Sequence, residues 1–153
     1  MSRGTIGVIL REPGARMPEK AHEHDAGWDI FATQEGFVCE GCIETFSTGL
    51  QFDVPPGWEV QIRSRSGLAR KHGIALANGV GTIDSNYSGI VAVMLTKLGA
   101  GDRDDPEESA YQIAAGDKIA QAVIYPVFGS MELRDHPHFT GERGETGFGD
   151  SGR

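Results

Sequence analysis

Short segments in which apolar and polar residues alternate recur along the chain, and turn residues separate them. The clearest cases are residues 6–10, 51–54, 59–63 and 120–125. A period of two is that of a strand with one buried face, and the Pro-Gly and Gly-rich breaks are typical of tight reversals. Short strands at close spacing predict an all-β domain, either a sandwich, a jelly roll or a barrel.

One segment departs from this pattern and predicts a short helix, from about Ser66 to His72. Gly73 follows it, and Gly is the usual residue at the left-handed position that ends a helix. Basic residues fill the last turn, where cations suit the helix dipole. The start, Arg65-Ser66-Gly67, offers backbone N–H groups and a guanidinium group to an anion.

Length and charge narrow the class of protein. A chain of 153 residues favours one domain with a real core. It carries 14 Lys and Arg against 22 Asp and Glu, a formal charge of -8, which argues against a nucleic-acid partner held by a basic surface. The longest N-terminal apolar run, residues 6–10, is too short for a signal peptide or a membrane span. We therefore expect a cytoplasmic protein with no membrane partner.

Cys39 and Cys42 form a lone C-x-x-C motif. Zinc usually takes four ligands, and nothing in the spacing of His22 and His24 to the cysteines makes these histidines the other two. We expect two reduced thiols at the ends of a tight strand reversal, with no metal bound.

The chain is organised around residues 78–89 and the apolar run 90–95 that follows. Read locally, this stretch is a β-hairpin whose first arm ends at Ile83. Asp84 lies where that arm meets the turn, and an isolated Asp at such a place usually only starts the turn. The run 90–95 is apolar on both faces, so we expect a cover on both sides, most simply a subunit interface.

Five segments resemble, in this order and at these intervals, the five motifs of the trimeric dUTPases. They are AGWDIFA (26–32), RSGLA (65–69), NGVGTIDSNYSG (78–89), GDKIAQ (116–121) and RGETGFGDSG (143–152). Each alone is weak, because Gly-rich and Ser-Gly strings are common, but chance does not explain five in register. The resemblance implies a β-clip jelly roll with one short helix that forms a homotrimer. It also implies one β domain over residues 1–139 and a flexible arm, residues 140–153, that closes over the site.

The resemblance further implies hydrolysis of dUTP to dUMP and pyrophosphate, which keeps uracil out of DNA and supplies dUMP for thymidylate synthesis. Asp84 becomes the catalytic residue, which orients and deprotonates the water that attacks the α-phosphorus. A carboxylate is a weak base, so most of the acceleration should come from in-line positioning and from Arg65, Arg143 and Mg²⁺. Asp29 should reach the Mg²⁺ through a water, because this ion keeps its waters and takes oxygens mainly from phosphates.

Three sets of substrate contacts follow from the same resemblance. The phosphate chain takes Arg65, Ser66, Gly67 and Gln121; uracil and sugar take Asn78, Gly81, Thr82, Ile83, Tyr87 and Ala92; the arm brings Arg143, Phe148, Gly149 and Ser151. Backbone groups of a strand edge can pair with uracil, and Tyr87 under the sugar would clash with a ribose 2′-OH. Taken singly, each residue has an ordinary structural explanation, such as a surface Arg, a turn Asn or a core Tyr.

Two residues depart from the family pattern in the arm. Thr146 stands where Gly is usual, and Asp150 stands where a neutral residue is common. A β-branched residue resists positive φ and a carboxylate repels phosphates, so the arm should close more weakly than usual. The acidic connection from Gly99 to Ala115 is also longer than the family's, and we expect a solvated loop without an assigned role.

Two other functions stay open at this point. A dCTP deaminase has the same fold but places a Glu in its pocket, and no Glu occurs between Asn78 and Leu95. A nucleotide sensor or protein-binding regulator that does not hydrolyse its ligand would use the acidic connection as a contact. Ammonia release from dCTP would support the first, and nucleotide binding without turnover the second.

Overall fold

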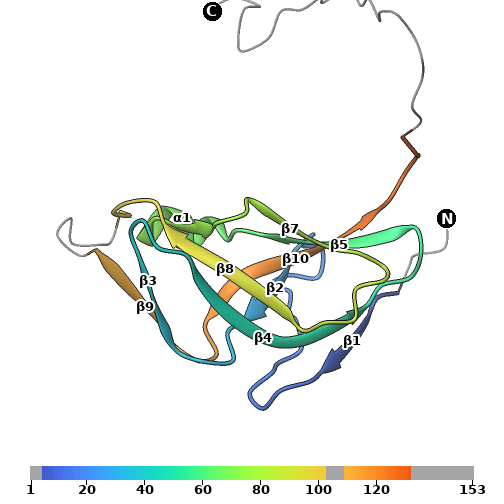
Figure 1. Ribbon diagram of the computed structural model, residues 1–153, viewed down its shortest axis with the longest axis horizontal. Coiled ribbons are helices and arrows are strands. Elements are labelled where there is room, and N and C mark those ends of the chain that lie inside the picture. The colour runs from blue at the N-terminus through green and yellow to red at the C-terminus, as the bar shows by residue number, and fades with distance from the viewer. Residues whose placement is uncertain (1–4, 103–108, 132–153) are drawn as a thin grey trace, which may run out of the picture.

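The computed structural model describes residues 5–102 and 109–131, which form short antiparallel strands and one short helix (Figure 1). The all-β class with a single short helix is therefore confirmed for this part of the chain. In chain order the elements are β1 (Gly7–Leu10), β2 (Trp28–Phe31), β3 (Gly36–Cys39), β4 (Glu44–Asp53), β5 (Trp58–Arg63), α1 (Ser66–His72), β6 (Ile74–Leu76), β7 (Val80–Ile83), β8 (Val91–Lys97), β9 (Ala110–Ile113) and β10 (Lys118–Pro126).

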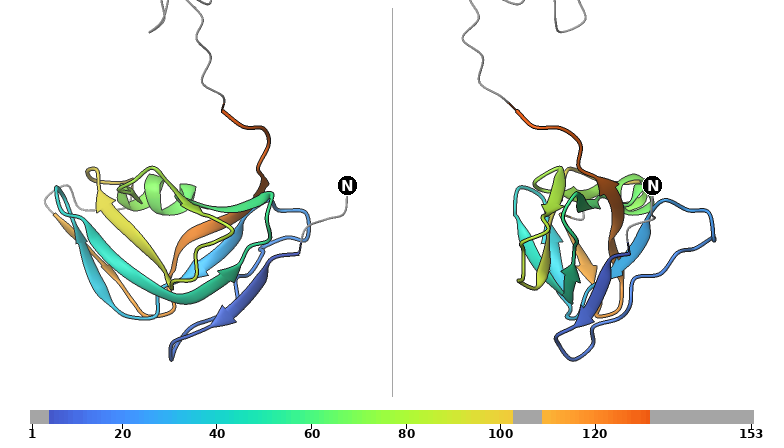
Figure 2. Two further views of the ribbon diagram at one scale, coloured as in Figure 1. Left: turned by 45° about the vertical axis from the view of Figure 1, so that its right-hand side comes forward. Right: turned by 90° about the vertical axis from the view of Figure 1, so that its right-hand side faces the viewer.

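Two four-stranded sheets face each other (Figure 2). One has the order β1-β4-β8-β6 and the other the order β2-β10-β5-β7, while β3 and β9 form a separate two-stranded sheet. The buried faces of all three sheets belong to one apolar cluster, because alternate residues of each strand point inward. Its fully buried side chains include Ile30, Val38, Leu50, Val60, Ile74, Val91, Val93, Leu95, Ile113 and Ile119.

The helix has the predicted bounds and the predicted end. Gly73 follows α1 in the left-handed conformation, with φ 63°, and its N–H donates to the Ala69 carbonyl at 3.0 Å. A side chain at Gly73 would collide with the backbone of Gly99. Lys97, which is 2% exposed, donates to the His72 carbonyl at 3.0 Å, so a cation lies at the C-terminus of the helix.

The alternating segments 6–10, 51–54, 59–63 and 120–125 all contribute to strands, as predicted. The hairpin is wrong: β7 pairs with β5, whereas β8 pairs with β4 and β6, so the two arms belong to different sheets. A local pattern shows where strands lie but not which edge each one joins. As a result, residues 84–90 cross from one sheet to the other, and a space opens between the two arms.

The strand β8 alternates instead of being covered on both faces. Val91, Val93 and Leu95 are buried, whereas Ala92 is exposed and Met94 is 38% exposed. A subunit cover over the outer face remains a prediction. The acidic connection is also not all loop, because β9 lies within it and pairs with β3; residues 103–108 lie outside the described part.

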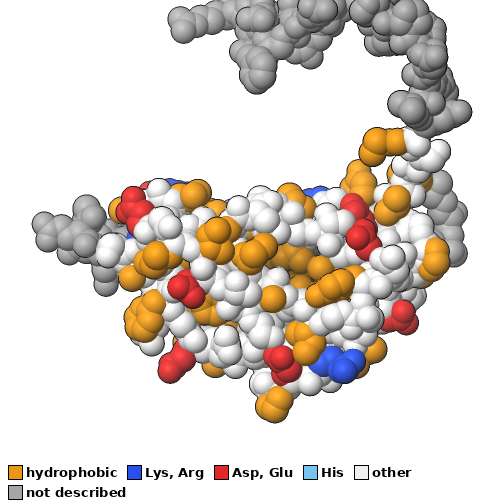
Figure 3. Space-filling view, viewed as in Figure 1, with side chains coloured by type: hydrophobic (Ala, Val, Ile, Leu, Met, Phe, Trp, Pro, Cys, Tyr) orange, Lys and Arg blue, Asp and Glu red, His pale blue; other side chains and the backbone are white. Residues whose placement is uncertain are grey.

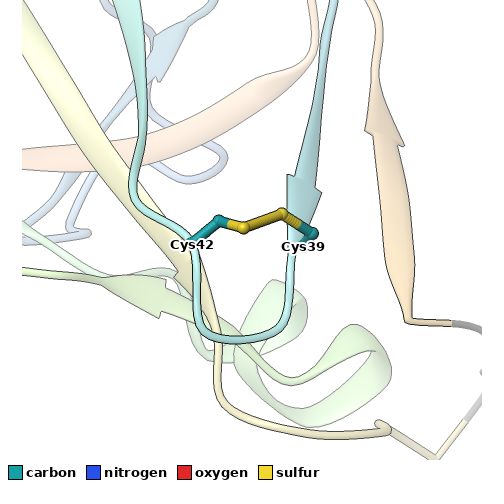
Figure 4. Close-up of a disulfide and its surroundings, with 2 residues drawn as sticks. All are labelled: Cys39 and Cys42. Atoms are coloured by element: carbon teal, nitrogen blue, oxygen red, sulfur yellow. A yellow bond between two sulfur atoms is a disulfide. The ribbon is translucent and has the colours of Figure 1, made fainter.

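Cys39 and Cys42 form a disulfide, so the prediction of reduced thiols is wrong (Figure 4). The predicted reversal itself is present, since Cys39 ends β3 and β4 begins at Glu44. The Cys42 N–H donates to the Cys39 carbonyl at 3.3 Å, and Gly41 has a φ of 74°. This turn brings the two Cα atoms to 5.4 Å, within the range that a disulfide requires.

Candidate functional site

A charged cluster lies where the ends of three strands of one sheet meet. It consists of Asp29 on β2, Lys118 and Gln121 on β10, and Arg65 just beyond β5. The strand β10 lies between β2 and β5, and Gln121 is the register partner of both Asp29 and Arg63. Sheet pairing therefore brings together side chains that are far apart in the sequence.

Asp29 joins the two cations of this cluster. Its Oδ1 accepts from Arg65 Nε at 3.0 Å and its Oδ2 from Lys118 Nζ at 2.8 Å. Arg65 also donates from Nη1 to the Lys118 carbonyl at 3.0 Å. The Asp29 side chain is 16% exposed, against 28% for Arg65 and 37% for Lys118. The carboxylate is thus shielded, and the cations face outward, where an anion can reach them.

Small and polar residues surround the cluster and leave room beside it. Gln121 donates from Nε2 to the Ser64 carbonyl at 3.0 Å, and a side chain at Gly27 would collide with Gln121. Ser66 and Gly67 are exposed at the start of α1. A Cβ added to Gly67 would meet nothing within 4 Å, so the chain itself does not require glycine there. Close approach of a ligand to this backbone would require it.

A pocket of about 320 Å³ opens between β7 and β8. Its size suits a small-molecule site, and a recessed apolar patch is visible between these strands (Figure 3). It is lined by Thr45, Ile62, Leu76, Asn78, Gly81, Thr82, Ile83, Tyr87, Val91, Ala92, Val93 and Met94. All six residues predicted to contact a base and sugar are among these. The separation of the two arms, which the hairpin prediction missed, is what creates the pocket.

Asp84 and Tyr87 lie at the rim of this pocket. Asp84 directly follows β7 and is exposed, and its carbonyl accepts from the Tyr87 N–H at 3.1 Å. The Tyr87 hydroxyl donates to the Ile90 carbonyl at 3.2 Å. A side chain at Gly89 would come within 2.5 Å of that hydroxyl, so the ring lies against the turn backbone. Asp84 therefore starts a turn and also presents its carboxylate to solvent beside the pocket.

Within one chain, the pocket rim and the charged cluster lie at opposite ends of the β5–β7 ladder. Val60 pairs with Ile83 at one end, next to Asp84, and Arg63 pairs with Val80 at the other, next to Arg65. Six residue steps separate Asp84 from Arg65 along the strand direction, roughly 20 Å at about 3.3 Å per residue. Asp84 and Arg65 therefore lie well apart within one chain.

Some site residues were missed by the sequence reasoning. Lys118 lies inside the segment 116–121 but was given no role, although its pairing with Asp29 places it in the cluster. Thr45 and Met94 line the pocket as register partners across β4 and β8, and no local sequence signal marks them. The predicted arm contacts, Arg143, Phe148, Gly149 and Ser151, lie outside the described residues, as do Thr146 and Asp150.

Asp29 is the carboxylate available for a metal in the charged cluster. Within residues 5–102 and 109–131, no group of three His, Cys, Asp or Glu side chains could hold a metal ion. An Mg²⁺ bound mainly by phosphates needs only one or two carboxylates. Each Asp29 oxygen has one cation partner, so a lone pair remains for a metal-bound water, and the residue fits that limited role.

The described residues also contain no helix long and apolar enough to cross a membrane.

Comparison with known proteins covers the whole chain. The dUTPase family model matches residues 14–152. The deoxyuridine 5'-triphosphate nucleotidohydrolase of Solibacter usitatus is 40% identical and covers 100% of this chain and 99% of its own length. That of Clostridium tetani is 34% identical, with 100% of both chains covered.

Solved structures agree with this match. A mutant dUTPase of Staphylococcus bacteriophage 80alpha with dUpNHpp has a TM-score of 0.84 and 29% identity, and it covers 99% of this chain and 100% of its own. A mutant dUTPase from phage phi11 of S. aureus, described with a structural Mg(II) ion, has a TM-score of 0.75 and 28% identity, with coverage of 89% and 99%. Sequence, fold and pocket agree, and the chain belongs to the dUTPase family, the deoxyuridine triphosphate nucleotidohydrolases.

Proposed function

We propose that this protein is a cytoplasmic dUTP diphosphatase that hydrolyses dUTP to dUMP and pyrophosphate, so that uracil stays out of DNA and dUMP becomes available for thymidylate synthesis. One observation carries the proposal: all six residues predicted to hold the base and sugar line one pocket. Asp29, Arg65 and Gln121, predicted for metal and phosphates, lie in one cluster with Lys118.

The pocket suits an uncharged pyrimidine. Its walls are largely apolar, and backbone N–H and C=O groups at Gly81 to Ile83 and near Ala92 can pair with the uracil edge. The Asn78 amide supplies a further polar group. Tyr87 lies at the rim, where its ring would support a deoxyribose and clash with a 2′-OH. A wall that lies close to C5 of the bound uracil would reject a thymine methyl by steric exclusion.

The charged cluster suits the triphosphate. Arg65 can pair with phosphate oxygens in a planar, two-pronged geometry, and Ser66 and Gly67 offer backbone N–H groups beside it. Gln121 adds an amide donor. Bound Mg²⁺ would neutralise charge on the phosphates, with Asp29 reaching it through a water. The ion pairs with Asp29 hold the Arg65 and Lys118 side chains in position before an anion binds.

Asp84 orients the attacking water and accepts its proton. Its exposed carboxylate directly follows Ile83, which lines the pocket, so it can reach the α-phosphate of a nucleotide bound there. A carboxylate base of this kind contributes about 10²- to 10⁴-fold. The remaining acceleration comes from positioning and from charge neutralisation by arginines.

We infer that the complete site uses more than one chain, and the placement of Arg65 and Asp84 at opposite ends of the β5–β7 ladder supports this. In a homotrimer, one chain supplies Arg65 and Gln121 and a second supplies the pocket with Asp84. The third reaches over with Arg143, Phe148, Gly149 and Ser151 from its arm, residues 140–153, while residues 1–139 form the β domain.

Pyrophosphate release from dUTP, compared with dCTP, dTTP and UTP, tests this function. We expect rapid pyrophosphate release from dUTP and not from the other three nucleotides, and we expect this release to depend on Mg²⁺. Ammonia release from dCTP would indicate a deaminase instead. Tight binding of dUTP without pyrophosphate release would indicate a nucleotide sensor.

A further inference from the structure

We propose that Cys39 and Cys42 form a reversible thiol–disulfide site that controls how firmly one wall of the nucleotide pocket is held. Its reaction partner is a disulfide or a thiol, either a small molecule such as glutathione or a redox protein. The proposed hydrolysis does not use these sulfurs. The kinetic part of this inference and its cytoplasmic setting rest on the proposed function.

The disulfide closes the turn between β3 and β4 (Figure 4). Cys42 is exposed and Cys39 is half-buried, and the residues between them, Glu40 and Gly41, are exposed as well. A Cβ added to Gly41 would meet nothing within 4 Å, so the space around this residue of the turn is open. An external thiolate can therefore reach the Cys42 sulfur.

A purely stabilising role explains this bond poorly. It joins residues only three apart in the sequence, and a cross-link that closes so short a loop restricts the unfolded chain little. The surrounding fold has its own supports: β3 pairs with β9 from Gly36 to Cys39, and Phe46 is 2% exposed. In a reducing cytoplasm, an exposed disulfide of this kind is labile and typical of redox sensing.

The exchange balances without any further reactant. The Cys42 thiolate attacks one sulfur of an external disulfide, and one external thiolate leaves. The Cys39 thiolate then attacks the Cys42 sulfur of the mixed disulfide, and the second external thiolate leaves. The two cysteine protons pass to the released thiols, so the protein is oxidised by two electrons as the external disulfide is reduced. The reverse reaction opens the bond.

The turn leads directly into the pocket wall. Cys42 lies two residues before Glu44, which begins β4 and pairs with Leu95 of β8. The next pair of this ladder is Thr45 with Met94, and both residues line the pocket. Ladder ends open most easily, so a covalent clamp two residues away limits local opening of this wall. When the disulfide is reduced, part of the binding free energy of the nucleotide is spent on ordering this wall, so the affinity is lower.

The experiment compares the full-length protein after incubation with dithiothreitol and after incubation with oxidised glutathione. Free thiols are trapped with iodoacetamide and counted by intact mass. We expect two alkyl groups on the reduced protein and none on the oxidised one, since the chain has 2 Cys. The KM for dUTP should be about three- to tenfold lower for the oxidised protein, with kcat unchanged. Hydrogen exchange at residues 43–46 should be slower in that state.

The matched control is the double variant Cys39→Ser, Cys42→Ser. Its KM and its exchange rates should equal those of the reduced protein in both buffers. The proposal is overturned if folded protein keeps both thiols in excess oxidised glutathione, if dithiothreitol cannot open the bond, or if zinc is bound by the thiols instead. Equal exchange at residues 43–46 in both states also overturns it. If dUTP is not hydrolysed at all, the proposed function fails, and alkylation with hydrogen exchange decides this inference alone.

Discussion

The charged cluster and the pocket differ in what holds them in place. In the charged cluster, side chains position one another, because Asp29 pairs with both Arg65 and Lys118. In the pocket, the backbone does this work: two strands of different sheets separate, and the residues between them form the walls. A substitution in the cluster should therefore disturb the positions of the other cluster side chains. The pocket should keep its geometry after a substitution, unless the replaced residue takes part in catalysis or shapes the walls.

Asp84→Asn, a change at the pocket, should have the largest effect of these variants. The amide is nearly isosteric, so nucleotide binding should persist while the proton acceptor is lost. We expect kcat to fall about 10²- to 10⁴-fold with little change in the dissociation constant. Single-turnover kinetics and equilibrium binding of a non-hydrolysable analogue measure the two quantities. A loss of affinity that accounts for the whole loss of rate would refute the base assignment.

Arg65→Met should have the next largest effect, on the cluster side. It removes the phosphate donor and also leaves Asp29 with Lys118 alone. We expect kcat/KM to fall about 10²- to 10³-fold, as when one fixed donor to a developing charge is lost. Arg70→Met is the matched control on α1. Its ion pair with Asp102 is exposed, with side-chain exposures of 83% and 60%, so activity should stay near the wild-type value. Equal losses in both variants would contradict a local role.

Tyr87→Ala should have a smaller effect, limited to selectivity. The ring lies at the pocket rim, and its removal admits a ribose, so the ratio of kcat/KM for dUTP over UTP should fall about tenfold or more. Tyr87→Phe keeps the ring and loses only the hydrogen bond to the Ile90 carbonyl, so it should keep the ratio. An unchanged ratio in the Ala variant would place sugar selection elsewhere.

Thr48→Val should change activity least and tests how far the pocket depends on the backbone. Thr48 is 1% exposed; its hydroxyl donates to the Val91 carbonyl at 2.7 Å and accepts from the Leu50 N–H at 3.2 Å. Its loss removes two buried hydrogen bonds to the backbone, at a cost of about 1–3 kcal/mol in the free energy of unfolding. Denaturant titration measures this, with Thr48→Ser as the control that keeps the hydroxyl. Stability equal to wild type in Thr48→Val would remove this link between β4 and β8.

The sequence predicted local features well and pairings poorly. The helix from Ser66 to His72 follows from its Gly stop and its basic last turn, both of which are local signals. The β7–β8 hairpin failed because both arms read as strands, while the edge each one joins depends on distant segments. Lys118 was missed because its role appears only when β2 and β10 pair and bring Asp29 to it.

The disulfide was misjudged for a different reason. Compartment chemistry predicted reduced thiols, whereas the turn geometry between β3 and β4 brings Cys39 and Cys42 close enough to bond. The pocket residues were found through the resemblance to a family, since residues such as Asn78 or Tyr87 have ordinary structural explanations when taken singly. These residues line a pocket only because β7 and β8 belong to different sheets and separate, which the sequence did not predict.

The central claim is that Arg65 and Asp84 at one site come from different chains, and mixing two inactive variants tests it most directly. Arg65→Met and Asp84→Asn chains are unfolded together in equal amounts, refolded, and shown by native mass spectrometry to form mixed trimers. If the site is shared, an intact Arg65 from one chain meets an intact Asp84 from another in about one quarter of sites, half of a half, by random assembly. Activity should then return to about a quarter of the wild-type value. Mixed trimers that remain as inactive as the separate variants would show that both residues serve one site from the same chain.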